Sequence, residues 1–144
     1  MKKLFILLIS FTIFNSGVMA SDADILKRQD SMKVVKEQIG ILAPMALGKA
    51  NFDSFLTEVS LNELLDAVIP FSTYFKYPPS EQSKTEASSE IWSNKKDFED
   101  KATDFVSDIK SAVLEEPQSA AELKNHFSKI TRNCKACHQS YRVK

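Results

Sequence analysis

The residues with the clearest chemical potential lie near the C-terminus, in the sequence Cys134-Lys135-Ala136-Cys137-His138. On a helix, residues three and four positions apart share a face, so this spacing places Cys137 and His138 on the same side as Cys134. Two thiols one turn apart can add to the two vinyl groups along one edge of a porphyrin, and the imidazole that follows can bind the iron from one side. The pattern C-x-x-C-H is typical of covalent c-type haem attachment. We therefore predict one covalent haem c.

Three other interpretations of the two cysteines are weaker. A disulfide between them would close a very small loop and stabilise the chain little. A thioredoxin-like dithiol belongs where a strand meets a helix, whereas this pair ends a helical pattern. A zinc site needs four ligands, and the only other histidine is His126, which we expect to be a solvated surface residue. A non-haem protein that uses the CxxC thiols for redox exchange remains the alternative from another class.

The group opposite His138 would decide what such a haem can do. Only six residues follow His138, and none is Met, His or Cys. Between residue 21 and the motif, the candidates are Met32, Met45 and His126. His126 lies about 120° round the helix from His138 and about 18 Å along it, which is too far to reach the same iron. Met32 shares a helix face with Arg28, so one helix could hold a cation near a haem carboxylate and an apolar side chain above the iron. Spacing alone is equally compatible with a core methionine and a solvated arginine.

Composition limits the fold and the partners. A length of 144 residues favours one domain. Three glycines and five prolines argue against a turn-rich β-sandwich. Nineteen basic residues balance nineteen acidic ones, which removes nucleic-acid binding as a default interpretation.

The first twenty residues have the three-part pattern of a secretory signal peptide. Lys2 and Lys3 precede an apolar run over 4–14, and Val18-Met19-Ala20 supplies a cleavage site. The eleven residues of this mostly apolar run reach only about 16 Å along a helix, less than the roughly 30 Å of a bilayer core. We therefore predict a signal peptide over 1–20, a mature domain over 21–144, a periplasmic location and no membrane span.

Four stretches carry apolar residues at helical intervals. They cover 21–48, about 51–74, about 90–114, and the chain from Ser119 almost to its end. Gly48 is a plausible stop for the first stretch, Pro44 is expected to bend or end it, and Pro70 to interrupt the second. Residues 76–89 have no period and include two adjacent prolines, so we expect a loop there.

The last stretch has the most regular pattern. Ser119 and Glu122 match a capping box in which each satisfies a backbone donor of the other. A heptad-like seam follows, made of Leu123, Phe127, Ile130, Cys134, Cys137 and Tyr141. No useful period-2 alternation occurs. We predict an all-α antiparallel four-helix bundle, with one haem c near the C-terminal helix.

The chain over 21–144 resembles the class II c-type cytochromes, in particular the cytochrome c′ family. The landmarks are Arg28-Gln29 and Met32 in the first helix, Glu90-Ile91-Trp92 opening the third, the Cys134-to-His138 motif, and Tyr141-Arg142 near the end. The resemblance implies a four-helix bundle that is usually a homodimer through its first two helices. For this chain, Val34, Ile41, Phe52, Leu56 and Val59 could supply the apolar face.

The resemblance also implies roles for individual residues. Cys134 and Cys137 would be the thioether residues and His138 the proximal ligand. Arg28 and Gln29 would contact the haem propionates or rim. The loop residues Thr85 and Glu86 would lie near the haem edge, and Arg142 close to the proximal imidazole.

Met32 takes the distal position, at which this class of cytochromes divides. An apolar pocket without a ligand leaves the iron five-coordinate and admits nitric oxide or carbon monoxide. A thioether ligand from Met32, which the following Lys33 also fits, gives a low-spin protein that acts purely in electron transfer. We favour the five-coordinate form: a periplasmic monohaem protein that binds small gases, exchanges electrons with a periplasmic redox partner, and is not an enzyme.

Overall fold

Four long helices form the molecule, which is described here by a computed structural model of residues 19–143. In chain order the elements are α1 (Asp22–Ala46), α2 (Ser54–Val68), the 3-10 helix η1 (Phe71–Phe75), α3 (Glu90–Ser93), α4 (Lys95–Glu115) and α5 (Ala120–Tyr141). Within residues 19–143 the only extended pairing is an isolated bridge between Ala87 and Arg142. The predicted signal peptide lies, up to residue 18, outside the described residues.

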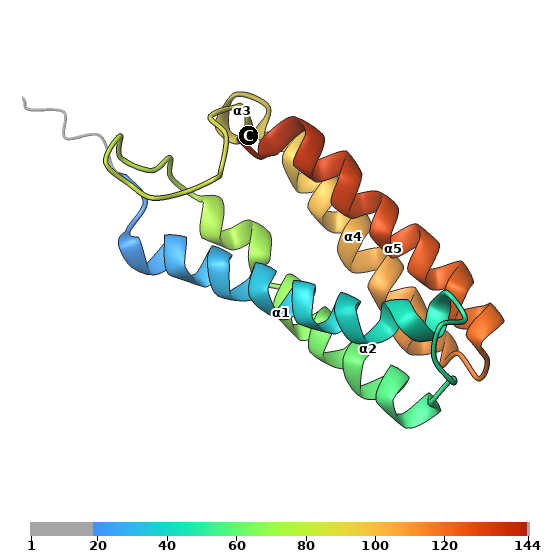
Figure 1. The fold of residues 1–144 in the computed structure, drawn as a ribbon. Helices are drawn as coiled ribbons and strands as arrows, with labels where there is room; N and C mark the ends of the chain where they lie inside the picture. The colour runs from blue at the N-terminus through green and yellow to red at the C-terminus, as the bar shows by residue number, and fades with distance from the viewer. Residues whose placement is uncertain (1–18, 144) are drawn as a thin grey trace, which may run out of the picture.

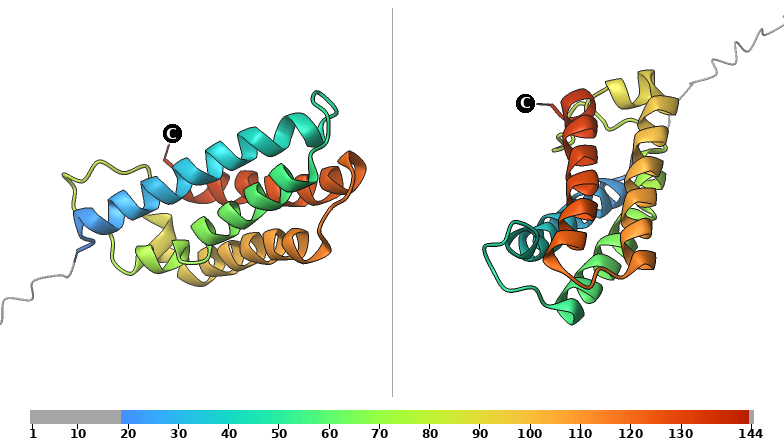
Figure 2. Two further views of the ribbon diagram at one scale, coloured as in Figure 1. Left: turned by 90° about the horizontal axis from the view of Figure 1, so that it is seen from below. Right: turned by 90° about the vertical axis from the view of Figure 1, so that its right-hand side faces the viewer.

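The helices α1, α2, α4 and α5 pack as an antiparallel bundle, as predicted (Figure 1). Each contacts two neighbours, so that α2 and α5 lie diagonally across the bundle (Figure 2). The start of α1, the end of α2, the start of α4 and the end of α5 share one end of the molecule. We call this the loop end, because the predicted loop over 76–89 lies there. None of the helices in the described part is both long and apolar enough to cross a membrane.

The core consists of two clusters of buried side chains. The larger one fills the body of the bundle with residues that include Leu42, Leu64, Ile109, Leu123 and Ile130, each fully buried. Burying one such side chain stabilises the fold by about 1.5–3 kcal/mol. The smaller one lies at the loop end and consists of Phe75, Ile91, Phe98 and Tyr141, which we call the aromatic cluster. The loop end therefore has a core of its own.

Side chains cap the helices where the sequence indicates. Ser119 Oγ accepts a hydrogen bond from the backbone N–H of Glu122 at 3.2 Å. The Glu122 carboxylate accepts from the N–H of Gln118 at 2.8 Å, one residue earlier than the predicted reciprocal bond to Ser119. The predicted capping box is therefore right in one half, and its second bond is shifted by one residue.

Two predicted helices are shorter than expected. The stretch over 51–74 is helical only over Ser54–Val68, and Pro70 separates it from η1 as predicted. The predicted single helix over 90–114 is wrong: Asn94, with φ −124° and ψ 47°, separates α3 from α4. Asn competes for local hydrogen bonds outside helices, and the Asn94 amide donates to the Glu90 carboxylate at 2.9 Å.

The first helix ends close to where Gly48 predicts. Pro44 lies inside the last turn of α1, and the helix continues to Ala46. Near a helix end a proline is tolerated more readily, because few further turns depend on the lost bond. Gly48 follows with φ +68°, a left-handed conformation that favours glycine.

Glu116 has the same left-handed backbone, with φ 45°, at the end of α4. A left-handed conformation strains a residue with a Cβ, and an acidic side chain is unfavourable at a helix C-terminus. We expect Glu116→Gly to raise the free energy of unfolding by about 1 kcal/mol in urea titrations. Gly48→Ala is the matched opposite: the added Cβ meets no atom within 4 Å, so only the backbone strain remains, and we expect a loss of about 1 kcal/mol. A less stable Glu116→Gly variant would contradict this interpretation.

Candidate haem-binding site

Arg28 is the most deeply buried charged residue at the loop end, with 4% of its surface exposed. Its Nε donates to the carbonyl oxygen of Tyr74 at 2.8 Å, and Nη2 donates to the same oxygen and to that of Tyr77. The guanidinium carbon lies 4.2 Å from the centre of the Phe75 ring. Burial lowers the pKa of Arg28, and the nearby Asp24 opposes that shift. Arg28 therefore fastens η1 to α1.

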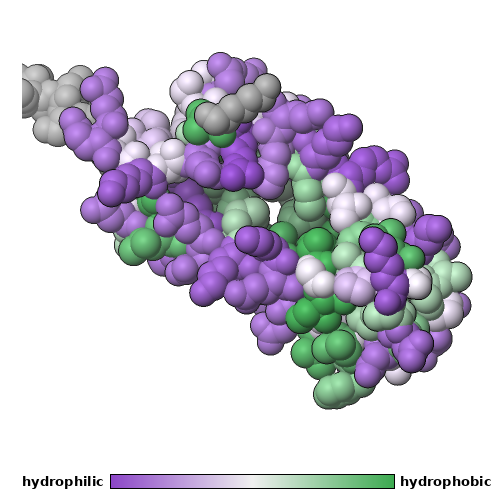
Figure 3. Space-filling model, in the orientation of Figure 1, coloured by the Kyte–Doolittle hydropathy of each residue, from purple (hydrophilic) through white to green (hydrophobic). Residues whose placement is uncertain are grey.

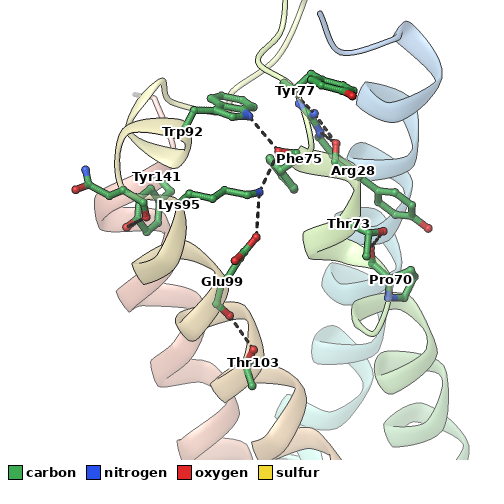
Figure 4. Close-up of polar contacts among 12 residues, drawn as sticks. Arg28, Pro70, Thr73, Phe75, Tyr77, Trp92, Lys95, Glu99, Thr103 and Tyr141 are labelled. Atoms are coloured by element: carbon green, nitrogen blue, oxygen red, sulfur yellow. Dashed lines mark hydrogen bonds and ion pairs between the residues drawn. The ribbon is translucent and has the colours of Figure 1, made fainter. Parts of the chain in front are cut away.

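Two further side chains bind the next carbonyl of η1. Trp92 Nε1 and Lys95 Nζ each donate to the carbonyl oxygen of Phe75 at 3.0 Å (Figure 4). Lys95 also forms an ion pair with Glu99 at 3.5 Å. The last carbonyls of a helix lack partners within it, so donors from elsewhere must satisfy them. Donors from α1, α3 and α4 therefore converge on the end of η1.

One polar atom in this arrangement remains without a partner. Arg28 Nη1 is buried and makes no hydrogen bond to any described residue. A buried N–H of a charged group is costly when it is unpaired. An anionic acceptor such as a carboxylate would satisfy it with a charge-assisted bond.

The two thiols lie on α5 at the same end of the bundle. Both are free and partly buried, and Cys137 packs against the aromatic cluster. Burial raises the pKa of each thiol; for Cys137, Lys101 opposes that shift and Cys134 adds to it. The predicted seam along α5 is buried at Leu123, Phe127, Ile130 and Tyr141. Cys134 and Cys137 continue this seam but are only partly buried, so the prediction that they belong to the core is correct only in part. The surface between the helix pairs is hollowed (Figure 3).

His138 is an exposed residue one position beyond Cys137. Partial desolvation of its ring lowers the pKa of His138, the charge of Arg142 lowers it further, and Glu86 opposes both. Arg142 Nε donates to Glu86 Oε2 at 2.6 Å. The imidazole makes no hydrogen bond or ion pair with another residue of the described part, so its nitrogens are free for a ligand.

The loop over 76–89 is bound to the end of α5 and to α1. The N–H of Ser88 donates to the carbonyl of Tyr141, and that of Val143 to the carbonyl of Glu86, both at 2.9 Å. Gln29 Nε2 donates to the carbonyl of Lys84 at 3.2 Å. Thr85 forms a hydrogen bond within the loop, because its Oγ1 accepts from the N–H of Ala87 at 3.2 Å. The residues predicted from opposite ends of the chain therefore meet around this loop.

The upstream methionines differ in their surroundings. Met32 is partly buried and packs against the larger core cluster. Met45 is 3% exposed, and its sulfur accepts a hydrogen bond from Thr57 Oγ1 at 3.9 Å. Met45 lies near the C-terminal end of α1, away from the loop end. Met32 is therefore the methionine of α1 that lies within one turn of Arg28.

His126 is buried, so the prediction of a solvated surface residue is wrong. Only 6% of it is exposed, and Nε2 lies 3.4 Å from Glu115 Oε2. The buried stripe of α5 is wider near its start than the heptad seam, because α4 covers the adjacent position. His126 lies at the opposite end of α5 from His138, as the spacing predicts.

Sequence reasoning missed one cluster beside the thiols. The Tyr141 hydroxyl donates to the Asp97 carboxylate, and Lys101 Nζ pairs with the same carboxylate at 2.6 Å. These contacts hold the pKa of Asp97 below its usual range, Lys101 contributing most. Burial first, and then the bond to Asp97, raises the pKa of Tyr141 to about 12. The four-residue spacing of Asp97 and Lys101 is a sequence signal for their pairing, whereas nothing local identifies Tyr141 as their partner.

Comparisons with known proteins agree on one family. The family model described as cytochrome c′ matches residues 23–142. Cytochrome c-556 of Agrobacterium tumefaciens (strain apple 185) is 30% identical over 113 residues, which cover 78% of this chain and 89% of the relative. Cytochrome c′ of Rhodopseudomonas palustris is 26% identical over 133 residues, covering 92% and 90%. The structure of cytochrome c prime from Shewanella frigidimarina superposes with a TM-score of 0.78 at 24% identity, over 85% of this chain and 95% of that one.

The residues at the loop end fit a covalent haem c, the cofactor of these relatives. Two free thiols lie one helical turn apart, and an imidazole without an internal partner follows them. Arg28 and Cys137 both contact Phe75 or its cluster, and Arg28 Nη1 lacks an acceptor of the kind that a propionate supplies. The two thiols, the imidazole and the unpaired Arg28 Nη1 therefore match the groups that bind a haem c.

The Tyr141–Asp97 bond predicts a distinct alkaline response. A tyrosine whose pKa rises from 10 to about 12 on folding stabilises the folded chain fully below pH 10, and that contribution is lost as the pH rises through 12. We expect Tyr141→Phe to lower the free energy of unfolding by about 1 kcal/mol at pH 7. The deficit should shrink between pH 10 and 12, as measured by urea unfolding at each pH.

Tyr77→Phe is the matched control, because the Tyr77 hydroxyl makes no hydrogen bond within the described residues. We expect it to leave the stability at pH 7 unchanged. A Tyr141→Phe deficit that stays constant from pH 9 to 12 would contradict the raised pKa of Tyr141.

Proposed function

Because the chain belongs to the cytochrome c′ family, whose model spans residues 23–142, we propose that it is a monohaem c-type cytochrome that exchanges electrons and binds small neutral gases. Its membership makes it a haem protein. The observation that supports the finer proposal most directly is the pair of free thiols on α5 beside an imidazole without an internal partner.

In this proposal the end of α5 holds the cofactor. The thiols of Cys134 and Cys137 would hold the haem through thioether bonds to its two vinyl groups. The His138 imidazole would bind its iron. The bound haem supplies a one-electron couple and, where its distal side is free, a position for a diatomic ligand.

The loop end orients the cofactor in this proposal. Arg28 Nη1, which lacks an acceptor in the described chain, is the donor for a propionate. Gln29 holds the backbone of the loop over 76–89 through Lys84, and Thr85 shapes that loop near the haem edge. The ion pair between Glu86 and Arg142 fixes the loop beside the imidazole.

The aromatic cluster shields one side of Cys137 from water. Phe75 and Phe98 lie with ring centres 4.8 Å apart, and Phe98 and Tyr141 at 5.4 Å. Apolar surroundings around a redox group favour the form with the lower charge, and burial is one of the means by which proteins set the reduction potential. The cluster therefore tunes the electron affinity of the site as well as holding Cys137.

Gas binding is the first candidate for the distal side. A structural relative at 24% identity and a TM-score of 0.74 is described as the nitric oxide complex of a mutant of cytochrome c prime from Alcaligenes xylosoxidans. In this chain the partly buried, apolar Met32 on α1 would border the distal position. An apolar border favours small neutral molecules over anions and water.

Ligation by Met32 is the second candidate. Met32 lies one turn after Arg28 on α1, whereas Met45 bonds Thr57 near the other end of that helix. A thioether in the distal position would raise the potential and leave electron transfer as the function. In both candidates the chain is an electron-transfer protein and not an enzyme.

The cellular setting of this proposal is the periplasm. The signal-peptide pattern over 1–20 supports export, and a periplasmic redox partner would exchange electrons with the haem.

A homodimer through α1 and α2 is also part of the proposal. Of the predicted apolar face, Ile41, Leu56 and Val59 are exposed, while Val34 and Phe52 are partly buried. Phe55, at 74% exposure, extends this surface, and apolar residues gather over α2 and the adjoining part of α1 (Figure 3). A second copy could bury that face.

Covalent attachment is tested by mass spectrometry of exported protein. We expect a mass gain of about 600 Da, the mass of one haem. The gain should disappear in Cys134→Ala/Cys137→Ala, because no sulfur remains to form a thioether. Parent protein without the gain, with a reversible disulfide between its thiols, would instead support the CxxC thiol redox alternative.

The distal side is tested by optical spectra with carbon monoxide. For the gas-binding candidate we expect high-spin bands that shift sharply with the gas, and Met32→Leu should change the spectrum little because the side chain only packs there. Sharp low-spin bands that ignore the gas, and their loss in Met32→Leu, would assign Met32 as the sixth ligand. Met45→Leu is the control and should leave the spectrum unchanged in either case.

A further inference from the structure

Two of the four long helices of this nearly neutral chain carry charge excesses of opposite sign. The helix α5 carries Lys124, Lys129, Arg132 and Lys135 against a single acidic residue, Glu122. The helix α2 carries Glu58, Glu63 and Asp66 and no cationic side chain. Because α2 and α5 lie diagonally across the bundle, these two charge excesses lie on opposite sides of the molecule.

The four cations of α5, which we call the basic face, point away from the core. Each is an exposed residue, whereas the buried stripe of α5 runs through Leu123 and Ile130. At about 100° per residue, Lys124, Arg132 and Lys135 fall within about 80° of one another on the side opposite that stripe. Lys129 lies beside them, toward α4. They therefore form a continuous strip along the helix.

In the described part of the chain, acidic residues lie beside the basic face without forming ion pairs with it. None of its four side chains forms an ion pair with an acidic residue of the described part, whereas Lys95, Lys96 and Lys101 on α4 all do. Asp104 and Asp108 of α4 line a groove of about 370 Å³ with Lys129 and Arg132. The Asp108 carboxylate there accepts from Asn133 at 2.7 Å instead of pairing with a cation. On the side of the basic face that is turned away from α4, the one acidic residue that α5 contributes is Glu122.

One end of the basic face, at Lys135, lies next to the candidate haem ligand on the helix surface. Lys135 precedes His138 by three residues, and residues three apart are neighbours on a helix surface. His138 is itself exposed, and Arg142, four residues further on, acts on its ring. A molecule docked along the strip would therefore lie against the same helix that holds the thiols and the imidazole.

We propose that the basic face of α5 is the docking surface for a redox partner whose own surface is acidic. The inference rests on the proposed function, because electrons need a short route between the two redox groups. Complementary charge steers such a partner to the correct side of a protein that has no net charge to attract it. The acidic side at α2 turns the same partner away, so that encounters are oriented before contact.

The test measures oxidation of the reduced holoprotein by hexacyanoferrate(III), an anionic acceptor that takes one electron and becomes hexacyanoferrate(II). For the parent we expect a rate constant that falls as salt is added, since screening removes the attraction. We expect Lys124→Glu/Arg132→Glu to lower the low-salt rate roughly tenfold and to match the parent at high salt. The milder variant Lys129→Gln/Arg132→Gln should have a low-salt rate between those of the parent and of Lys124→Glu/Arg132→Glu.

Lys33→Glu/Lys36→Glu is the matched control. It changes the net charge by the same amount on exposed positions of α1, and we expect a much smaller effect. Calorimetric binding of poly-L-glutamate gives a second readout that does not depend on the haem: the parent and the control should bind it, and Lys124→Glu/Arg132→Glu should not.

Equal slowing by both double variants, or equal binding of poly-L-glutamate by both, would overturn the docking surface. The visible spectrum of each variant separates this outcome from failure of the proposed function. A parent protein without a haem spectrum would contradict the proposed function. Intact haem spectra, with equal effects of the α5 and α1 double variants on the rate, would contradict the docking surface alone.

Discussion

The loop end depends on the need to satisfy the carbonyl groups that terminate η1. Arg28, Trp92 and Lys95 come from three helices, and each donates to the carbonyl of Tyr74 or Phe75. Side-chain bonds to carbonyls at a helix end fix position as well as energy, because their geometry is narrow. The break at Asn94 belongs to the same arrangement, since Trp92 precedes it and Lys95 follows it, and both reach one oxygen.

This constraint explains how a bundle with a well-filled body can hold a cofactor at one end. Along α5 the residues Leu123 and Ile130 are fully buried, while Cys134 and Cys137 on the same seam are only partly so. The aromatic cluster lines this region from the η1 side and does not close over it. A core built from packed aliphatic residues would leave no room, because protein interiors tolerate few voids. The separate small core of the loop end is therefore what allows the thiols to remain accessible.

Local patterns predict much of this from the sequence, and tertiary contacts account for what they miss. The C-x-x-C-H spacing, the Ser119 cap and the left-handed Gly48 depend on residues a few positions apart, so the sequence alone indicates them. The cation of Arg28 is buried because carbonyls 46 and 49 residues away accept from it. His126 is buried because α4 covers it, and α4 contributes Glu115. Neither contact leaves a periodic pattern in the sequence from which it could be predicted. The roles of the site residues remain predictions.

The attachment of the loop over 76–89 to the last residues of the chain has a consequence for the order of events during biosynthesis. Besides the bond from Gln29 on α1, this loop is held by contacts with Tyr141, Arg142 and Val143. Translation and export both proceed from the N-terminus, so α1, α2 and α4 are complete before these residues emerge. The loop can be bound to α5 only after residues 141–143 have been made and exported. A nascent chain that ended at His138 would carry both thiols and the imidazole and would still lack the contacts of residues 141–143 with this loop.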